Sequence, residues 1–150
     1  GIPEALIRSA GPEVARRATE MLEEVVGDPR FVVDLDDGVH VTDSSRAVWS
    51  GTALRRPVGN LSGGQKALVE SAVRLAISEV SGAHGVTRWR TVFADEMASG
   101  LGAAAPAWVQ LLRSSARRQG LRHMLVVSHD PRVIACLDTV FEIGQGGGAQ

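Results

Sequence analysis

Lysine is almost absent from this chain: 16 of its 150 residues are basic, and Lys66 is the only lysine among them. A phosphate-binding P-loop has the pattern G-x-x-x-x-G-K-[ST], whose lysine reaches the β- and γ-phosphates of a nucleotide. Lys66 follows Gly63-Gly64-Gln65 and fits no such pattern. The chain therefore cannot hold those phosphates in this kind of cradle by itself.

Cysteine and long apolar runs are also scarce. Cys136 is the only cysteine, so no internal disulfide is possible. It stands in an apolar context, and we expect a small buried residue in a reducing, cytosolic protein. No apolar stretch approaches the about 20 residues of a membrane span, and no signal-peptide pattern is present, so we expect no membrane partner. With 44% hydrophobic residues, the chain can form one domain with its own core.

Charge gives little direct information about partners. The net charge is −1, which is no global nucleic-acid signature. Arg55 and Arg56 precede the motif described next and could lie near a nucleotide or a partner. Four arginines surround the predicted end of a helix: Arg113, Arg117, Arg118 and Arg122. We favour the interpretation that they complement the negative end of the helix dipole, and a phosphate-contacting patch is the alternative.

The most informative segment is Leu61-Ser62-Gly63-Gly64-Gln65 (LSGGQ), which directly precedes a helical pattern that runs to about Val80. A Ser-Gly-Gly turn at the start of a helix leaves backbone N–H groups unpaired and carries about half a positive charge. Two glycines also let a phosphate come close to the main chain. The segment thus predicts an anion site. An ordinary loop and helix cap is the alternative.

Two carboxylates follow the next apolar run, Thr91–Ala94, which we predict to be a buried parallel strand. Asp95 and Glu96 would then lie at the carboxyl end of the strand, where open α/β sheets bind ligands. Asp95 can hold Mg²⁺, which takes oxygen ligands and keeps several waters. Glu96 can orient or deprotonate an attacking water. A solvent-facing turn is the alternative for these two acids.

A histidine follows a second apolar run. Met124–Val127 leads into Ser128-His129-Asp130-Pro131, whose proline suits the first turn of a helix. His129 would then lie in a polar loop at the end of another strand. A cap or turn residue is the alternative for an isolated histidine.

In this order, the motifs resemble the C-terminal half of an ABC-type ATPase head, from about residue 30 to 143. The matching segments are LSGGQ for the signature motif, VFADE (92–96) for the Walker B strand, Ser99-Gly-Leu-Gly102 for the D-loop and VVSHD (126–130) for the switch-histidine loop. Two positions depart from the family pattern. Met97 stands where a proline commonly follows the catalytic glutamate, and Gly102 replaces the usual D-loop aspartate, which helps two heads communicate.

The segments around the signature indicate a branch of this family. Gln65–Ser78 carries small and aliphatic residues where transporter domains carry Gln-Arg and Ala-Arg-Ala-Leu, so it looks like SbcC-type DNA-repair ATPases and their SMC relatives. Glu13–Val26 has an amphipathic helical pattern that stops at Gly27. Phe31–Val41 predicts a β-hairpin around Asp37-Gly38. This order is expected where a coiled-coil arm re-enters a head, and a simple packed surface helix is the alternative.

We therefore predict an α/β fold: the C-terminal lobe of a P-loop, ABC-type ATPase head with a small, mostly parallel sheet flanked by helices. Strands are expected near 91–94, 123–127 and 138–143, and helices near 65–80, 104–119 and 131–136. The chain would form a single domain with a coiled-coil-proximal helix (1–27), a hairpin and lead-in (28–60), the motif-bearing lobe (61–143) and a flexible tail (144–150).

The resemblance implies ATP hydrolysis at a composite site between two heads. Asp95 would bind Mg²⁺ through water, Glu96 would act as general base, and His129 would contact the γ-phosphate. The signature residues would bind the γ-phosphate of the nucleotide held by the opposite head: Ser62, Gly63, Gly64 and Gln65.

The same resemblance implies the partners and the location. The partners would be the N-terminal Walker A half of the same head, a second head in an ATP-dependent dimer, DNA, and an SbcD-like nuclease subunit. The location would be cytoplasmic and nucleoid-associated. In SMC and SbcC proteins a long coiled coil joins the two halves of the head, so we expect this chain to be inactive alone. The alternatives are a nucleotide-binding domain of an ABC transporter and a non-catalytic interaction lobe.

Overall fold

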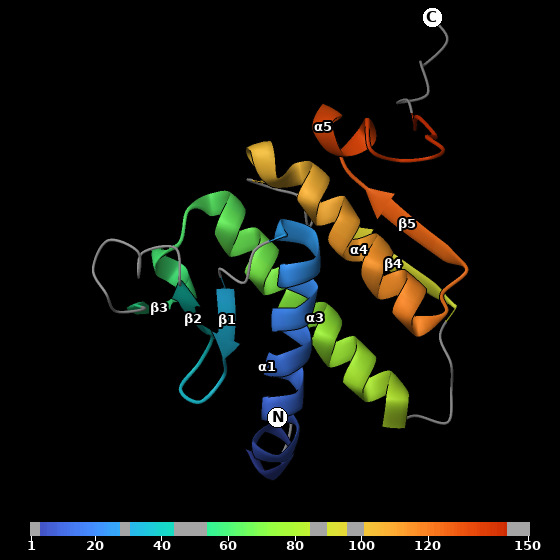
Figure 1. Cartoon of the computed structure of the whole chain (residues 1–150). Helices are drawn as coiled ribbons and strands as arrows, with labels where there is room; N and C mark the ends of the chain where they lie inside the picture. Colours follow the sequence, from blue (N-terminus) through green and yellow to red (C-terminus); the bar gives the residue numbers. More distant parts are fainter. Residues whose placement is uncertain (1–3, 28–30, 44–53, 85–89, 96–100, 144–150) are drawn as a thin grey trace, which may run out of the picture.

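The computed structural model describes residues 4–27, 31–43, 54–84, 90–95 and 101–143. Three long helices lie at its centre: α1 (Glu4–Val26), α3 (Gly63–His84) and α4 (Ala105–Gln119). Figure 1 shows a three-stranded sheet beside α1 and a two-stranded sheet beside α4. The described chain is thus an α/β fold, in agreement with the prediction.

Helix α1 carries its apolar stripe into the core. The buried residues of this stripe are Val14, Ala18, Met21 and Leu22. The helix begins at Glu4, earlier than the predicted amphipathic segment from Glu13, and includes Pro12 in its interior. An interior proline removes one hydrogen-bond donor and its ring crowds the carbonyl of residue i−4, so Pro12 costs the helix stability without ending it. After the helix, Gly27 has a φ of +70°, which suits a helix terminus.

The predicted β-hairpin is confirmed, and it gains a third strand. β1 (Phe31–Asp34) pairs antiparallel with β2 (His40–Asp43), and the connection includes Gly38 at a φ of +109°. β3 (Leu54–Pro57) pairs antiparallel with β2 on its other edge. We did not predict β3, because Leu-Arg-Arg-Pro lacks the apolar alternation that marks a half-buried strand. The buried side chains of this sheet are Phe31, Val33 and Val41.

Helices α3 and α4 pack against each other around a buried tryptophan. Trp108 on α4 is 0% exposed, and its indole N–H donates a hydrogen bond to Ser71 Oγ on α3 at 3.0 Å. The neighbouring buried residues include Val69, Ala72, Ala76, Leu111 and Leu112. Helix α3 is longer than the predicted 65–80, and α4 agrees closely with the predicted 104–119. None of the helices in the described ranges combines the length and apolar character that crossing a bilayer requires.

Strands β4 (Thr91–Asp95) and β5 (His123–Val127) form the predicted parallel pair. One face of the pair packs toward α4, and Ala94 on this face is only 2% exposed. The opposite face carries large apolar side chains that are exposed: Phe93, Leu125 and Val127. Alternation along both strands thus leaves one face of the sheet uncovered within the described residues.

The strand predicted near 138–143 is wrong. These residues have no regular secondary structure, and the sheet of β4 and β5 has two strands. Val140, Phe141 and Ile143 are exposed by 47%, 86% and 97%. A strand forms only where a neighbouring backbone supplies the ladder of hydrogen bonds, and no described strand pairs with this run. The apolar composition of 139–143 alone therefore does not make a strand in this chain.

Helix α5 (Pro131–Ile134) follows β5 and agrees with the helix predicted near 131–136, since a turn continues it through Cys136. Asp130 caps the helix by accepting a hydrogen bond from Arg132 N–H at 2.9 Å. Cys136 is partly buried, less than we predicted, and its thiol donates to the carbonyl oxygen of Arg132 at 3.2 Å.

Candidate nucleotide-binding site

The LSGGQ segment forms the start of α3, with Leu61 at the edge of the core. Gln65 N–H donates a hydrogen bond to Ser62 Oγ at 3.4 Å. In return, Gln65 Oε1 accepts hydrogen bonds from Ser62 N–H at 3.2 Å and from the Ser62 hydroxyl at 3.0 Å. This reciprocal arrangement of an N-cap serine and a glutamine three residues later is a capping box. The motif thus stabilises its own turn.

The capping box leaves the N–H groups of Gly63 and Gly64 as donors at the tip of the helix. The first N–H groups of a helix have no acceptor in the preceding turn, and no described residue supplies one for these two. The helix dipole adds positive potential at the same place, which suits a phosphate. The two interpretations of the motif are therefore compatible: it is a helix cap, and it has the geometry of an anion site. Binding of a nucleotide by this turn stays a prediction.

Gly64 has no room for a side chain. A Cβ on Gly64 would lie 2.9 Å from the carbonyl oxygen of Leu101 and 3.2 Å from Ala104 Cβ. Leu101 is 2% exposed, and the short 3₁₀ helix η3 (Gly102–Ala104) follows it. The turn at Gly64 is therefore packed against Leu101 and Ala104 of the same chain. Glycine is required at position 64 by this packing, whatever the turn binds.

Gly102, which departs from the family pattern, has a local conformational reason. Its φ of +52° lies in the left-handed region, where glycine is the least strained residue. A Cβ there would lie 3.7 Å from Arg132 Nη1, an ordinary contact distance, so the backbone conformation and not crowding favours glycine. The predicted catalytic residue Glu96 lies outside the described residues, as do Met97 and the first part of the D-loop.

The parallel strands bring Asp95 and His129 to the same edge of the sheet. Asp95 ends β4 level with the last residue of β5, and His129 follows two residues after β5. Both side chains are exposed. The loop between β5 and α5 is held by its own polar groups, since Asp130 N–H donates to Ser128 Oγ at 3.1 Å. This edge is the position that α/β sheets use for ligands.

Asp95 is the only predicted metal ligand within the described residues. No group of three or more His, Cys, Asp or Glu side chains converges on a common point in the described ranges. Mg²⁺ is commonly held by one or two carboxylates together with waters and substrate phosphates. A single carboxylate at this edge fits that pattern only when a nucleotide supplies the other ligands, so Mg²⁺ binding stays a prediction.

Two of the arginines considered as phosphate ligands are engaged within the fold. Arg55 Nε donates to Asp34 Oδ2 at 2.7 Å across the three-stranded sheet. The pKa of Asp34 is lowered, first by a hydrogen bond from the backbone N–H of Asp36 and then by Arg55. Arg113 Nη2 forms an ion pair with Asp138 at 2.7 Å. Arg55 and Arg113 therefore have structural roles in this chain.

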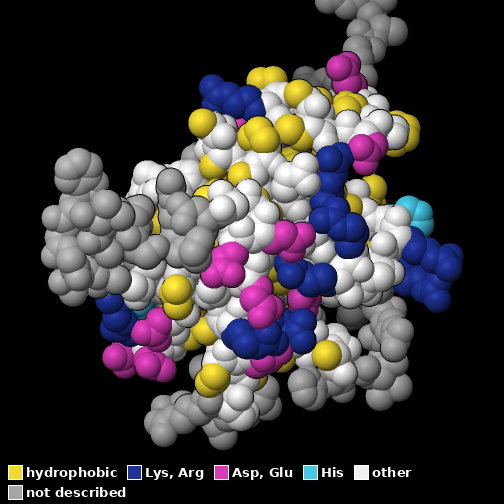
Figure 2. Space-filling view, in the orientation of Figure 1, with side chains coloured by type: hydrophobic (Ala, Val, Ile, Leu, Met, Phe, Trp, Pro, Cys, Tyr) yellow, Lys and Arg dark blue, Asp and Glu magenta, His cyan; other side chains and the backbone are white. Residues whose placement is uncertain are grey.

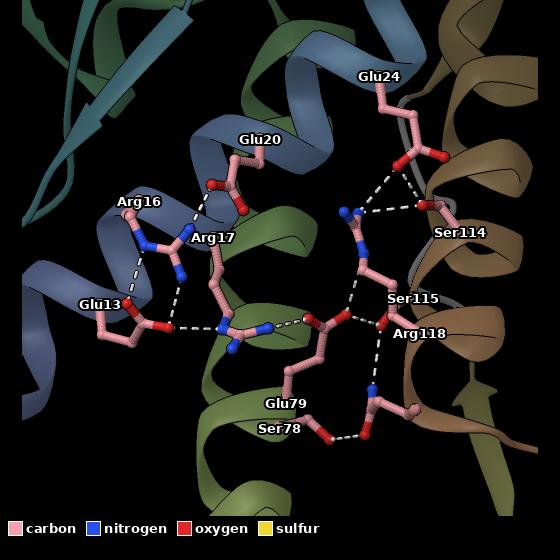
Figure 3. Close-up of polar contacts among 11 residues, drawn as sticks. Glu13, Arg16, Arg17, Glu20, Glu24, Ser78, Glu79, Ser114, Ser115 and Arg118 are labelled. Carbon is pink, nitrogen blue, oxygen red and sulfur yellow. Dashed lines mark hydrogen bonds and ion pairs between the residues drawn. The ribbon is translucent and has the colours of Figure 1, made fainter.

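A buried carboxylate that we did not single out from the sequence joins the three long helices (Figure 3). Glu79 on α3, with a side chain 4% exposed, contacts Arg17 of α1 at 3.4 Å and Arg118 of α4 at 3.6 Å. The Ser115 hydroxyl donates to Glu79 Oε1 at 3.0 Å. A buried carboxylate needs such partners, because burial without them is costly. The sequence feature that could have identified Glu79 is its position three residues after Ala76, on the buried stripe of α3.

A second carboxylate, Glu24 of α1, binds the last turns of α4. It accepts a hydrogen bond from the Ser114 hydroxyl at 2.6 Å, and it pairs with Arg118 at 3.1 Å and Arg117 at 3.4 Å. These contacts lower the pKa of Glu24, the Ser114 hydroxyl having the largest effect. Because Arg117 and Arg118 also lie in the last turn of α4, they fit the favoured interpretation as partners of a helix end.

Comparison of the sequence with protein-family models gives no match, and comparison with curated proteins gives none. The structure is similar to solved SMC heads. The SMC head domain from Thermotoga maritima has a TM-score of 0.61 at 18% identity, and the similarity covers 89% of this chain and 44% of that chain. The chain has the fold of part of an SMC head.

Two further structures agree with this result. A chain from work on ATP-driven dimerization and DNA-stimulated activation of SMC ATPases has a TM-score of 0.64 at 15% identity, with 97% of this chain and 84% of that chain covered. An SMC head bound to the C-winged helix domain of ScpA has a TM-score of 0.54 at 16% identity, with 90% and 40% covered. The present chain thus spans less than half of two of these SMC heads. The similarity concerns the fold.

Proposed function

We propose that this chain is the C-terminal half of an SMC- or SbcC-like ATPase head. The observation that carries the proposal is the presence of two features on one SMC-like fold. The first is the capped LSGGQ turn with its free N–H donors, and the second is the sheet edge that bears Asp95 and His129. A helix cap alone, or two exposed side chains alone, would specify no function. Their combination is what a nucleotide shared between two heads requires.

Each candidate residue has a role in this proposal. Asp95 holds Mg²⁺ through water, Glu96 takes the proton of the attacking water, and His129 contacts the γ-phosphate on the same head. The signature turn caps the γ-phosphate of the opposite head through the N–H groups of Gly63 and Gly64 and the Ser62 hydroxyl. For this, the hydroxyl exchanges its hydrogen bond with Gln65 for one with a phosphate oxygen.

The open side of the parallel pair supports a head split into two halves. Strand β5 pairs only with β4 among the described strands, so its other edge is free. The run 139–143 has the composition of a strand and exposes its apolar side chains. In the proposal, a strand of the Walker A half pairs with the free edge of β5. The same half supplies the P-loop that the chain lacks.

The neighbours suggest which further partners to test first. DNA-stimulated activation and binding of ScpA are described for SMC structures similar to this one. We therefore propose DNA, a second head and a ScpA-like subunit as partners, with an SbcD-like nuclease as the SbcC-specific alternative. Such an assembly would act at the nucleoid in the cytoplasm.

The proposal is tested with the full-length protein that the gene encodes. We expect a P-loop and heptad repeats upstream of residue 1. Glu96→Gln is expected to abolish ATP hydrolysis and to retain ATP-dependent dimerisation, whereas Ser62→Arg is expected to abolish dimerisation, measured by light scattering with and without ATP. A Glu96→Gln protein that hydrolyses ATP at the original rate would indicate an interaction lobe. A P-loop without a coiled coil would indicate a transporter domain.

A further inference from the structure

Three exposed basic residues lie together at the amino ends of β4 and β5: Arg90, Arg122 and His123, named the cationic edge below. The carbonyl oxygen of Arg90 accepts hydrogen bonds from Arg122 N–H at 2.8 Å and His123 N–H at 3.1 Å. These two bonds fix the starts of the strands side by side. Arg90 and Arg122 therefore precede two adjacent strand starts that are joined by backbone hydrogen bonds.

The arginines of the cationic edge differ from those between the helices. Arg17 and Arg118 pair with Glu79, and Arg113 pairs with Asp138. In contrast, no carboxylate of a described residue forms an ion pair with Arg90 or Arg122. Like charges just before two neighbouring strands repel each other, so an external anion that lies between them is favoured. Figure 2 shows a histidine beside Lys or Arg side chains at the right-hand edge, away from the acidic groups over α1.

The cationic edge is separate from the candidate nucleotide site. Asp95 and His129 lie at the carboxyl ends of the strands, and Arg90 and Arg122 precede the amino ends. Strands of five residues span roughly 16 Å at about 3.3 Å per residue. An anion at the cationic edge is therefore a different ligand from the phosphates at the opposite edge.

We propose that the cationic edge binds the phosphodiester backbone of DNA. Guanidinium groups bind phosphate oxygens in a bidentate geometry, and such backbone contacts position a protein on DNA independently of sequence. A protein partner would require an apolar or aromatic centre. The apolar side chains nearby, Phe93 and Leu125, lie further along the strands, on the exposed face of the β4–β5 pair. The proposal rests on the proposed function only in the choice of DNA among polyanions.

The low net charge of the chain makes this edge testable. Because the rest of the surface gives no positive excess, a few arginines should account for most of the binding to DNA. The experiment is a titration of a fluorescein-labelled random DNA duplex with the 150-residue chain at low salt, followed by fluorescence anisotropy. The test variant is Arg90→Glu with Arg122→Glu. The charge-matched control is Arg74→Glu with Arg132→Glu, two exposed arginines on α3 and α5.

We expect the test variant to bind on the order of tenfold more weakly and to lose about two from the slope of log affinity against log salt. The control is expected to stay within a factor of about two of the unmodified chain. The proposal would be overturned if both variants lost the same DNA affinity, or if the unmodified chain did not bind DNA. It would also be overturned if polyglutamate displaced the labelled duplex as well as unlabelled DNA does. Circular dichroism shows whether each variant keeps its fold. The neutral variant Arg90→Gln with Arg122→Gln removes the two charges without adding negative ones, so a loss of binding in it is not due to misfolding or repulsion. ATP hydrolysis by the full-length protein tests the proposed function independently.

Discussion

Gly64 shows how one residue of a ligand-binding motif can be required by the fold. Because Gly64 has no side chain, a phosphate could come close to its backbone. For the same reason the carbonyl oxygen of Leu101 lies so close that a Cβ on Gly64 would be 2.9 Å from it. The turn and the D-loop segment are thus held together by direct backbone packing. A movement of one should displace the other, which links the LSGGQ turn to the segment that follows β4.

The contact between Gly64 and Leu101 should be visible in the stability of the chain. Gly64→Ala is expected to destabilise the chain by about 2 kcal/mol, because the methyl group forces the backbone near Leu101 to move. Gly59→Ala is the matched control: Gly59 lies a few residues earlier, and a Cβ there meets no atom within 4 Å. Its stability should change by less than about 0.5 kcal/mol. Urea unfolding followed by circular dichroism gives both values, and equal midpoints for the two variants would refute the packing argument.

At the level of helices, Glu79 joins α1, α3 and α4 at one point. Its buried carboxylate has partners from both neighbouring helices, Arg17 and Arg118, and a hydroxyl donor in Ser115. A buried ion pair contributes little net stability compared with an apolar replacement, but removing one partner leaves the others uncompensated. The cluster therefore ties α1, α3 and α4 together at one point, and α1 is the helix expected to continue the arm.

We predict that Glu79→Ala destabilises the chain by about 2 kcal/mol, a value reduced because Arg17 and Arg118 are about one-third exposed and can bind water instead. Glu70→Ala is the control on the same helix, since Glu70 forms a surface pair with Lys66 at 3.9 Å and no other ion pair among the described residues. Its effect should be below about 0.5 kcal/mol. The argument fails if thermal or urea unfolding finds the two variants equally stable.

The acid sensitivity of α1 should depend on Glu13. Hydrogen bonds from Arg16, and then from Arg17, lower the pKa of Glu13 from 4.5 to about 2 in the folded chain. The unfolded chain binds the proton first as pH falls, so the stabilisation is complete above about pH 4.5 and is lost progressively toward pH 2. We expect Glu13→Gln to reduce the loss of stability over this window.

The control for this pH experiment is Glu23→Gln, on an exposed residue of the same helix. Urea midpoints of the unmodified chain and both variants would be compared across the acidic range. Glu23→Gln should retain the acid sensitivity of the unmodified chain. Identical pH profiles for all three proteins would show that the Glu13 contacts do not contribute to folding.

Local features of the fold could be predicted from the sequence, and non-local ones could not. The periodicity of α3 and α4 and the turn signal at Asp37-Gly38 are contained in short segments, and these elements are confirmed. Whether a segment forms a strand depends on which backbone lies beside it. For this reason the sequence did not predict β3 and wrongly predicted a strand near 138–143. The edge that carries Asp95 and His129 followed from two apolar runs. The partners of Glu79 did not, because they come from distant helices.

At the scale of the whole molecule, the described chain has a core but an unfinished sheet. Helix α4 packs on one face of the β4–β5 pair, and the other face exposes Phe93 at 72%, Leu125 at 49% and Val127 at 56%. Adjacent apolar side chains on a free-edged sheet are prone to associate with another surface. In the proposed head, that surface is the Walker A half. In the isolated chain, the nearest substitute is another copy of the chain.

We therefore predict that the isolated chain self-associates and that Phe93→Ser reduces this association without lowering stability, because Phe93 contributes little to the core. Ile77→Ser is the control, since Ile77 is a large exposed apolar residue of α3, 46% exposed, away from the sheet. Sedimentation velocity at increasing concentration should show fewer oligomers for Phe93→Ser only. In the full-length protein, the same substitution should lower ATP hydrolysis, because the two halves pack less firmly. If Phe93→Ser and Ile77→Ser have the same effect in both experiments, the exposed face is an ordinary surface and the sheet is complete without a second half.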